Sequence, residues 1–167
     1  MQKIHTFLWF DDQAEQAAEH YVKVFTARRE AFGGGGPSEI TNVARYGDAG
    51  PGTPGQAMTV NFTLDGQEFT ALNGGSEFRF TEAISLFVSC GSQAEVDQLW
   101  DALVEGGEES QCGWLKDRYG LSWQIVPERM LELLGDPDPG RSQRAMRAML
   151  SMRKIDLAEI ERAADAA

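Results

Sequence analysis

The chain has 167 residues, 42% of them hydrophobic and 10% aromatic, so it is long enough to bury a core and is not globally disordered. Its formal net charge of −11 argues against binding to the phosphate backbone of nucleic acids, which needs a clustered basic surface. No apolar run reaches the roughly 20 residues of a membrane span, and the N-terminus lacks the features of a signal peptide. We therefore expect a cytoplasmic protein that neither crosses a membrane nor binds nucleic acid.

The chain begins with a predicted strand and an amphipathic helix. Residues 4–10 are β-branched and aromatic and stop at two aspartates, which is typical of a strand. Asp12 then stands where a helix N-cap is expected, with Glu15 three positions later as in a capping box. Apolar residues recur at helical spacing as far as about Phe25, so the sequence predicts a helix with one side available for a sheet.

Glycine and proline residues separate the predicted elements in the next part of the chain. Residues 33–36 are four glycines after a helix, a position that favours a loop rather than a cofactor-binding turn. A strong hairpin signal follows at Asp65-Gly66, between two apolar runs. Three strands are predicted here, at residues 40–46, 57–64 and 67–73.

The same order of elements then starts again. Residues 84–90 form a predicted strand, and Ser92 and Glu95 form a capping box at the start of a helix that runs to Val104. Two final strands are predicted at residues 111–115 and 121–126. The two cysteines, Cys90 and Cys112, are too few and too far apart for a disulfide framework, and we expect both to be reduced.

The last forty residues differ from the rest and are predicted to be helical. A short helix is expected over residues 128–134, a rigid turn over 135–140, a helix over 142–152, and a last helix capped by Asp156. Met146, Met149, Leu150 and Met152 give this segment an apolar surface that short helices cannot bury alone. It should pack on its own body or on a second subunit.

An internal repeat is the most informative feature of the sequence. Gln13-Ala14-Glu15 recurs as Gln93-Ala94-Glu95, 80 positions later (93 − 13), each time just after a strand. That offset places His5 on Ser85 and Phe7 on Phe87. The two final hairpins also superpose, which places Thr70 on Gln124. We interpret the chain as two copies of a βαβββ module.

Strand alternation indicates which side chains share a face. Candidate ligand-binding residues with aromatic rings or polar groups lie on equivalent faces of the two modules if the repeat holds: His5, Phe7, Trp9, Thr70, Leu72, Ser85, Phe87 and Gln124. An aromatic surface with a few polar groups suits an apolar or aromatic small molecule. The alternative is that these faces are ordinary packing surfaces. Cys112 is interpreted as a small buried residue rather than a nucleophile.

Several stretches resemble one protein family, namely LWFDDQAEQAAEHYVKVF, FTALNGGSEFRFTEAIS, QAEVDQLW, QCGWLKDRYGLSWQIVP and AMLSMRKIDLAEIERA. They are similar to the PhnB-like, or 3-demethylubiquinone-9 3-methyltransferase-like, group of the vicinal-oxygen-chelate (glyoxalase/bleomycin resistance/dioxygenase) superfamily. The resemblance implies an α+β fold in which two paired βαβββ modules form a cup-shaped mixed sheet. It implies one domain over residues 1–127, with modules at about 1–75 and 82–127, and a helical C-terminal extension over 128–167. It also implies a homodimer.

The resemblance also points to the positions of a metal site. Metal-dependent relatives draw ligands from the first and last strands of each module, which correspond here to His5, Thr70, Ser85 and Gln124. Only His5 is a strong ligand for a divalent transition metal, so no metal or other cofactor is predicted. A strand shifted by one residue would bring Glu68 in instead.

Three classes of function stay open at this point. The first is a small-molecule binding protein that carries out no chemistry, which the weak metal-ligand set and the aromatic surface favour. The second is an enzyme, either a metal-assisted isomerase or lyase or a methyltransferase as the family label suggests. His5 is then the one candidate base, because a histidine can exchange a proton near neutral pH. Against methyl transfer, the first strand–helix junction, residues 9–12, has no glycine for a cofactor turn. A third possibility is an accessory dimer whose helical tail contacts a partner.

Overall fold

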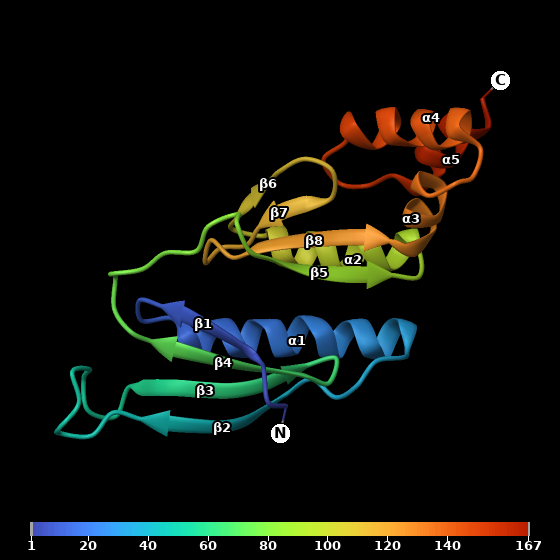
Figure 1. Ribbon diagram of the computed structural model, residues 1–167. Helices are drawn as coiled ribbons and strands as arrows, with labels where there is room; N and C mark the ends of the chain where they lie inside the picture. Colours follow the sequence, from blue (N-terminus) through green and yellow to red (C-terminus); the bar gives the residue numbers. More distant parts are fainter. Residues whose placement is uncertain (1, 167) are drawn as a thin grey trace. The chain divides into compact units, whose positions relative to one another are not determined.

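The computed structural model describes residues 2–166 of the chain, which divide along the sequence into two compact units, one ending at Phe80 and the other beginning at Thr81 (Figure 1). Each unit has its own four-stranded mixed sheet with a helix packed on one face. Together with three C-terminal helices, the elements make an α+β protein, as the sequence predicts. The order of elements is βαβββ in both units, which confirms the predicted repeat of the module.

The first unit contains β1 (Thr6–Phe10), α1 (Ala14–Phe32), β2 (Glu39–Arg45), β3 (Ala57–Leu64) and β4 (Gln67–Asn73). Its strands lie in the order β1-β4-β3-β2. The first and last strands are parallel, with Phe7 opposite Thr70, and the other neighbours are antiparallel. The β3–β4 hairpin turns at Asp65-Gly66, both with positive φ, as the aspartate–glycine dipeptide predicts.

The core of the first unit lies between α1 and one face of the sheet. Alternate residues of the strands point at the helix, so Phe62 of β3 and Phe69 of β4 stack with ring centroids 5.3 Å apart. Tyr21 of α1 is fully buried and its ring lies 6.4 Å from that of Phe62. The apolar spacing of α1 therefore faces the sheet, as an amphipathic helix requires.

The start of α1 differs from the prediction that Asp12 caps it. The N-cap is Gln13, whose side chain makes no capping hydrogen bond. The side-chain oxygen of Asn73, at the end of β4, instead accepts a hydrogen bond from the Ala14 N–H at 2.8 Å. A residue distant in sequence thus satisfies one of the free N–H groups at the helix start.

The end of α1 also differs from the prediction. The helix continues seven residues past Phe25, to Phe32, and the four glycines follow it. This loop is not merely a spacer, because Gly36 packs against the hairpin turn of β3 and β4. A Cβ atom on Gly36 would lie 2.7 Å from the Cα atom of Gly66. Arg28 of α1 fixes the same turn by an ion pair with Asp65 at 3.1 Å.

The second unit contains β5 (Ser85–Cys90), α2 (Gln93–Val104), β6 (Glu108–Glu109), β7 (Trp114–Lys116) and β8 (Ser122–Pro127). Its strand order, β5-β8-β7-β6, repeats that of the first unit. Ser92 caps α2 as predicted, accepting a hydrogen bond from the Glu95 N–H at 3.2 Å. The predicted strand 111–115 is shorter, because residues 110–113 form a turn in which Cys112 has a positive φ.

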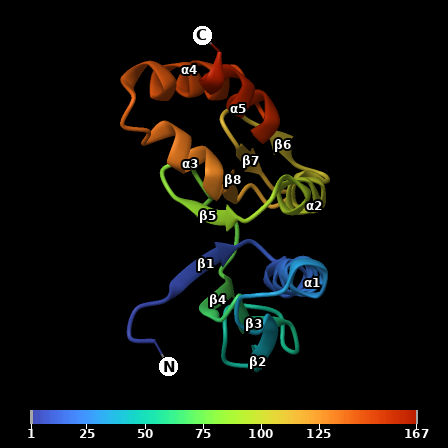
Figure 2. The same ribbon diagram turned by 90° about the vertical axis from the view of Figure 1, so that its right-hand side faces the viewer.

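The C-terminal segment folds into α3 (Glu128–Leu134), α4 (Pro139–Leu150) and α5 (Leu157–Asp165), which lie together in the second unit (Figure 2). The predicted turn 135–140 is shorter, because α4 begins at Pro139, which suits a first helical position. Asp156 caps α5 as predicted. These helices share a buried apolar cluster with the end of β8: Val126, Met130, Leu133, Ala145, Met152, Ile155, Ile160 and Ala164.

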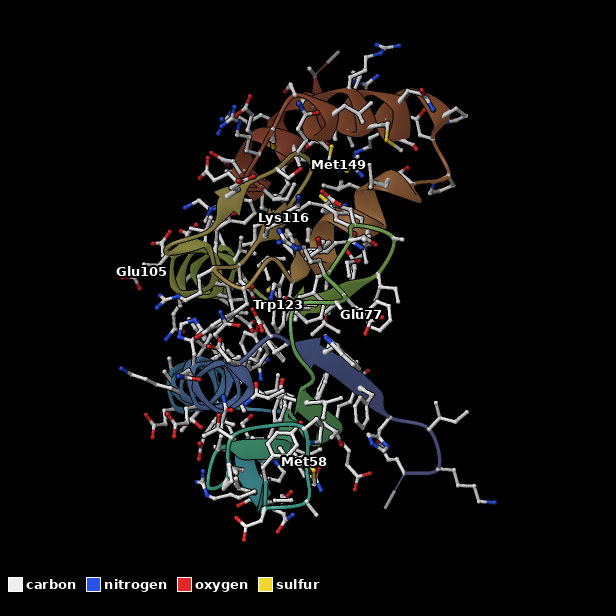
Figure 3. All side chains as sticks on the ribbon, turned by 90° about the vertical axis from the view of Figure 1, so that its left-hand side faces the viewer. Met58, Glu77, Glu105, Lys116, Trp123 and Met149 are labelled. Carbon is white, nitrogen blue, oxygen red and sulfur yellow. The ribbon has the colours of Figure 1, made fainter. Side chains whose placement is uncertain are left out.

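Side-chain contacts bind this helical tail to the rest of its unit. The amide of Gln93, at the start of α2, donates to the Ile155 carbonyl and accepts from the Leu157 N–H, both at 2.8 Å. Met149 of α4 packs against the buried cluster (Figure 3). The tail therefore packs on its own body, one of the two arrangements predicted. Within residues 2–166, no helix is both long and apolar enough to span a bilayer.

Candidate functional site

The first candidate surface is the face of the first sheet that is turned away from α1. Strand alternation puts Phe7 and Trp9 of β1 on this face, and the parallel register sets Thr70 and Leu72 of β4 beside them. The Phe7 side chain is 57% exposed, although it lies in the middle of a strand. Thr70 is almost fully buried. This face thus has an exposed aromatic ring next to an enclosed hydroxyl group.

A chain of three polar side chains crosses this face. His5, just before β1, contacts the Thr70 hydroxyl through Nε2 at 3.1 Å. The Thr70 hydroxyl in turn donates to Oδ1 of Asn61, on β3, at 3.0 Å. These side chains can contact one another in this order because β4, which carries Thr70, lies between β1 and β3 in the sheet. An imidazole is therefore held in place by two neutral groups.

His5 and its partners line a small hollow of about 130 Å³. Its polar lining also includes Glu68 of β4, and Thr41 and Thr63 from β2 and β3. One carboxylate oxygen of Glu68 accepts a hydrogen bond from the Gln2 N–H at 2.7 Å, and the Glu68 N–H donates to the Gln2 side chain at 3.4 Å. This reciprocal pair holds the chain segment that carries His5.

Trp9 is fixed by the segment that follows β4. Its indole N–H donates to the Gly75 carbonyl at 2.8 Å, and Phe78 meets the ring edge-on at a centroid distance of 4.9 Å. Gly74 lies so close that an added Cβ atom would be 2.4 Å from the indole ring. The edge of the Trp9 ring and part of its face are therefore already in contact with the protein. The Phe7 ring leaves more of its surface open to a ligand.

The second candidate surface is the face of the second sheet that is turned away from α2. Phe87 of β5 is 49% exposed here, in the position equivalent to Phe7. The Gln124 amide of β8 donates to the Ser85 hydroxyl of β5 at 2.8 Å. At the end of β7, Lys116 pairs with Glu82. The hydrogen bond between them raises the pKa of Lys116 and lowers that of Glu82.

The eight predicted site residues thus fall into two groups, five in the first unit and three in the second. In each group, the residue at the start of the first strand contacts a residue two positions further along its parallel neighbour: His5 with Thr70, and Ser85 with Gln124. The structure brings each pair together by a hydrogen bond. Leu72 lies beyond Thr70 on β4, opposite Trp9.

These residues do not make a good site for a divalent transition metal. The four positions implied by the family contain one imidazole, two hydroxyls and an amide, and no carboxylate or thiolate. The polar groups within each pair also satisfy one another. In the part of the chain from residue 2 to residue 166, no three His, Cys, Asp or Glu side chains gather to hold an ion.

Two contributors to the first hollow were not predicted from the sequence. Asn61 was treated only as part of a strand, and its role depends on which strand lies beside β4. Glu68 was considered as a metal ligand in a shifted register, whereas its carboxylate holds the Gln2 backbone. The sequence signal for Asn61 was the alternation along β3. Its two neighbours face α1, so the Asn61 side chain lies on the opposite face of the sheet, the face that carries Thr70.

Two βαβββ units with this strand order define the class of the molecule, which is the glyoxalase/bleomycin resistance, or vicinal-oxygen-chelate, fold. The model of one family, described as 3-demethylubiquinone-9 3-methyltransferase, matches residues 2–126. The chain belongs to this family. The match ends at the close of β8, so the helical tail lies outside it. No curated protein matches the chain significantly.

Solved structures agree with this assignment. A PhnB protein from Bacillus cereus, named as a candidate 3-demethylubiquinone-9 3-methyltransferase, is 36% identical, with a TM-score of 0.65. The match covers 75% of this chain and 99% of that one. Protein PA1353 from Pseudomonas aeruginosa has the same fold at 20% identity and a TM-score of 0.58, with 77% of this chain and 98% of that one covered.

Proposed function

We propose that this protein binds an apolar or aromatic small molecule on the sheet faces turned away from α1 and α2, without a strong metal site. The observation that carries the proposal is the exposure of Phe7 and Phe87 at equivalent positions in the middle of two sheets. An exposed ring in the middle of a strand leaves apolar surface in water unless a ligand covers it. The neighbouring His5–Thr70 and Ser85–Gln124 pairs supply the few polar groups by which such sites orient ligands.

The family description favours a second candidate, methyl transfer to an aromatic substrate. It rests on the name shared by the family and the Bacillus cereus relative. The strand–helix junction after β1 has no glycine, and its first free helix N–H is already bound by Asn73. This junction is therefore poorly suited to a nucleotide-like methyl donor. The binding function is the better supported of the two.

Isothermal titration calorimetry with 2-naphthol and with 2-methoxynaphthalene tests the binding function. We expect at least one probe to bind saturably, and Phe7→Ala and Phe87→Ala each to weaken binding roughly 5- to 30-fold through lost ring contact. Phe32→Ala is the matched control, since Phe32 is an exposed phenylalanine at the end of α1, and it should leave affinity unchanged. Failure of both probes to bind would contradict the proposal. Saturable binding of S-adenosylmethionine would favour the transferase instead.

We also propose that the protein is a cytoplasmic homodimer. Leu131 of α3 and Leu150 of α4 are about half exposed, which leaves apolar surface on the tail for a second subunit. Sedimentation velocity at micromolar concentration should give the mass of two chains. A single monomeric species under these conditions would contradict this expectation.

A further inference from the structure

One row of side chains on the second sheet combines hydroxyl groups with a positive charge. The strand pairing sets Ser122 of β8 directly between Ser85 of β5 and Lys116 of β7 (Figure 3). Side chains of directly paired residues point to the same side of a sheet. Ser122 also shares its side with Gln124, two residues along β8, so the whole row lies on the face that is turned away from α2.

The Ser122 hydroxyl lacks the hydrogen bond that a buried polar group needs. Ser122 is only 1% exposed, and within residues 2–166 its Oγ atom has no hydrogen-bond partner. Such a group is costly to bury, because it has lost its hydrogen bonds to water. The neighbouring Ser85 hydroxyl accepts from Gln124 and still has its own hydrogen to donate. Both serines can therefore donate to a ligand atom in this row.

Lys116 supplies the positive charge of the row, and a carboxylate already lies on it. Its ammonium group forms an ion pair with Glu82, and the two side chains are 36% and 61% exposed. An ammonium group has three hydrogens, so one partner leaves others available. An ion pair between exposed side chains contributes little to stability. Another carboxylate can therefore replace that of Glu82 on Lys116 at small cost.

The equivalent row of the first sheet carries the opposite charge. Ser122 stands 54 positions after Glu68 (122 − 68), the offset at which the final hairpins of the two modules superpose. The residue opposite Glu68 is Thr63, whereas the residue opposite Ser122 is Lys116. A carboxylate and a hydroxyl in the first sheet thus correspond to a hydroxyl and an ammonium group in the second. An anion is repelled by the first row and attracted by the second.

An aromatic surface lies beside the charged row. Phe87 follows Ser85 by two residues on β5, so both side chains point to the same side of the sheet, about 7 Å apart along the strand. Phe87 is half exposed. Trp114 of β7 lies in the same row as Phe87, with Gln124 between them. An aromatic ring that bears a carboxylate can therefore reach from one row to the next.

From these groups we propose that the second sheet binds the carboxylate of an aromatic acid, with Lys116, Ser85 and Ser122 as its donors. The ligand carboxylate takes the place of Glu82 on Lys116, and the ring lies on Phe87. Glu82 is then a built-in competitor that occupies the ammonium group when no ligand is bound. This assignment rests on the proposed binding function, and it adds the chemical class of the ligand and the residues that recognise it.

Titration calorimetry with 2-naphthoate and 2-methoxynaphthalene separates this assignment from the binding function as a whole. The two probes share a ring system, but only 2-naphthoate carries a negative charge. At low salt we expect the unmodified protein to bind 2-naphthoate roughly 5- to 20-fold more tightly, because hydrogen bonds to charged groups are the stronger ones. Equal affinities, or weaker binding of 2-naphthoate, would overturn the carboxylate assignment and leave the binding function standing. Binding of neither probe would overturn both.

Substitutions of the two members of the ion pair should act in opposite directions. Lys116→Met removes the charge, so the preference for 2-naphthoate should disappear while 2-methoxynaphthalene still binds. Glu82→Gln removes the competing carboxylate and should tighten the binding of 2-naphthoate roughly 2- to 5-fold. A pair that served only the fold would give losses in both variants. Weaker binding of 2-naphthoate to Glu82→Gln would therefore contradict the proposal.

Lys154 and Asp97 provide the matched controls. They form an ion pair in the same unit, and the side chain of Lys154 is 37% exposed, close to the value for Lys116. Lys154→Met and Asp97→Asn should leave the affinity for both probes unchanged. Equal losses of 2-naphthoate binding in Lys116→Met and Lys154→Met would indicate a general effect of charge and would overturn the assignment.

Ser122→Ala tests the buried hydroxyl. It should weaken the binding of 2-naphthoate roughly 3- to 10-fold, the effect of one hydrogen bond to a charged group. The melting temperature of the ligand-free protein should stay the same or rise, because the hydroxyl has no partner to lose within the described residues. A lower melting temperature with unchanged affinity would show that Ser122 serves the fold, and would contradict its assignment as a donor.

NMR of the lysine side chains reports the contact itself. The chain has four lysines, and the signal of Lys116 is identified by its loss in Lys116→Met. In protein labelled with ¹³C and ¹⁵N at lysine, 2-naphthoate should shift the side-chain signal of Lys116 more than the other three. The same signal should stay in place with 2-methoxynaphthalene. A signal of Lys116 that does not respond to 2-naphthoate would overturn the assignment.

Discussion

At the scale of single residues, Asp117 shows how one side chain organises a turn. It lies between β7 and β8 and is only 2% exposed. Its carboxylate accepts hydrogen bonds from the Tyr119 and Leu121 N–H groups and from the Trp123 indole, at 2.8, 3.1 and 2.9 Å. These three donors would be costly to bury without an acceptor. The carboxylate therefore ties the backbone of this turn to the indole of β8.

Replacing Asp117 by alanine should lower the free energy of unfolding by about 3 kcal/mol, because it leaves buried donors unsatisfied. Asp117→Asn should cost less, since its one oxygen can still accept from the backbone. Asp101→Ala, at an exposed position of α2, is the control and should change stability by less than about 0.5 kcal/mol. Urea denaturation measures all three. An effect of Asp117→Ala no larger than that of the control would show that these hydrogen bonds contribute little.

Gly36 gives a second prediction at this scale. An added Cβ atom would lie 2.7 Å from the backbone of Gly66, which cannot move as a flexible side chain can. Gly36→Ala should therefore destabilise the protein by about 1–3 kcal/mol, as overpacking does elsewhere. Gly47→Ala faces open space and should be neutral or slightly stabilising. Thermal unfolding of the two variants distinguishes them, and equal melting temperatures would contradict the close packing of this loop.

At the scale of elements, the helical tail is held to α2 by polar contacts and to β8 by apolar ones. Ile155 is fully buried in the cluster that the tail shares with β8. Ile155→Ala should cost about 2–5 kcal/mol, the usual effect of removing a buried aliphatic side chain. Ile84→Ala makes the same chemical change at a position that is 70% exposed, and should cost far less. Similar unfolding free energies for the two variants would mean that the tail is not part of the core.

The tail contact with α2 should also depend on pH. Lys154 donates to Asp97 at 2.9 Å, and this hydrogen bond lowers the pKa of Asp97 and raises that of Lys154. Since the pKa of Asp97 is lower in the folded state, its contribution is present above the ordinary value of about 4 and is lost as pH falls through the folded value. The pair is partly exposed, so we expect only a few tenths of a kcal/mol. Asp97→Asn should be less stable than the parent at pH 7 and equal to it at pH 2; a gap that persists at pH 2 would contradict this origin.

The elements were predictable where a local pattern decides them. Alternation located the strands of the first unit and β5 and β8 of the second, whereas the two-residue β6 was not predicted and β7 starts later than expected. Ser92 and Asp156 cap their helices as their sequence positions indicate. The end of α1 was not predictable, because its last turns carry charged residues without a clear apolar stripe. Its start depends on Asn73, which is 59 residues away, so no local signal could identify that partner.

At the scale of the whole molecule, the repeat carried the most information about the candidate site. Aligning the two modules placed His5 on Ser85 and Thr70 on Gln124, and the family resemblance grouped these four positions. In the structure the parallel pairing of first and last strands has the same register in both modules, which brings His5 to Thr70 and Ser85 to Gln124. The repeat could not predict the hydrogen bond between Thr70 and Asn61 or the hydrogen bonds between Gln2 and Glu68. Those contacts depend on which strands are neighbours and on where the N-terminal segment lies. The ligand itself stays a prediction.

One measurement tests the central claim most directly, namely mapping of the 2-naphthol site by ¹H–¹⁵N correlation spectra of the labelled protein. We predict saturable shifts of backbone amides around Phe7 and Thr70 in the first unit and around Phe87 and Gln124 in the second. The amides of α4 and of the exposed side of α1 should not move. Shifts confined to the tail or to α1, or no saturable shift at all, would contradict the proposal that these sheet faces bind an aromatic ligand.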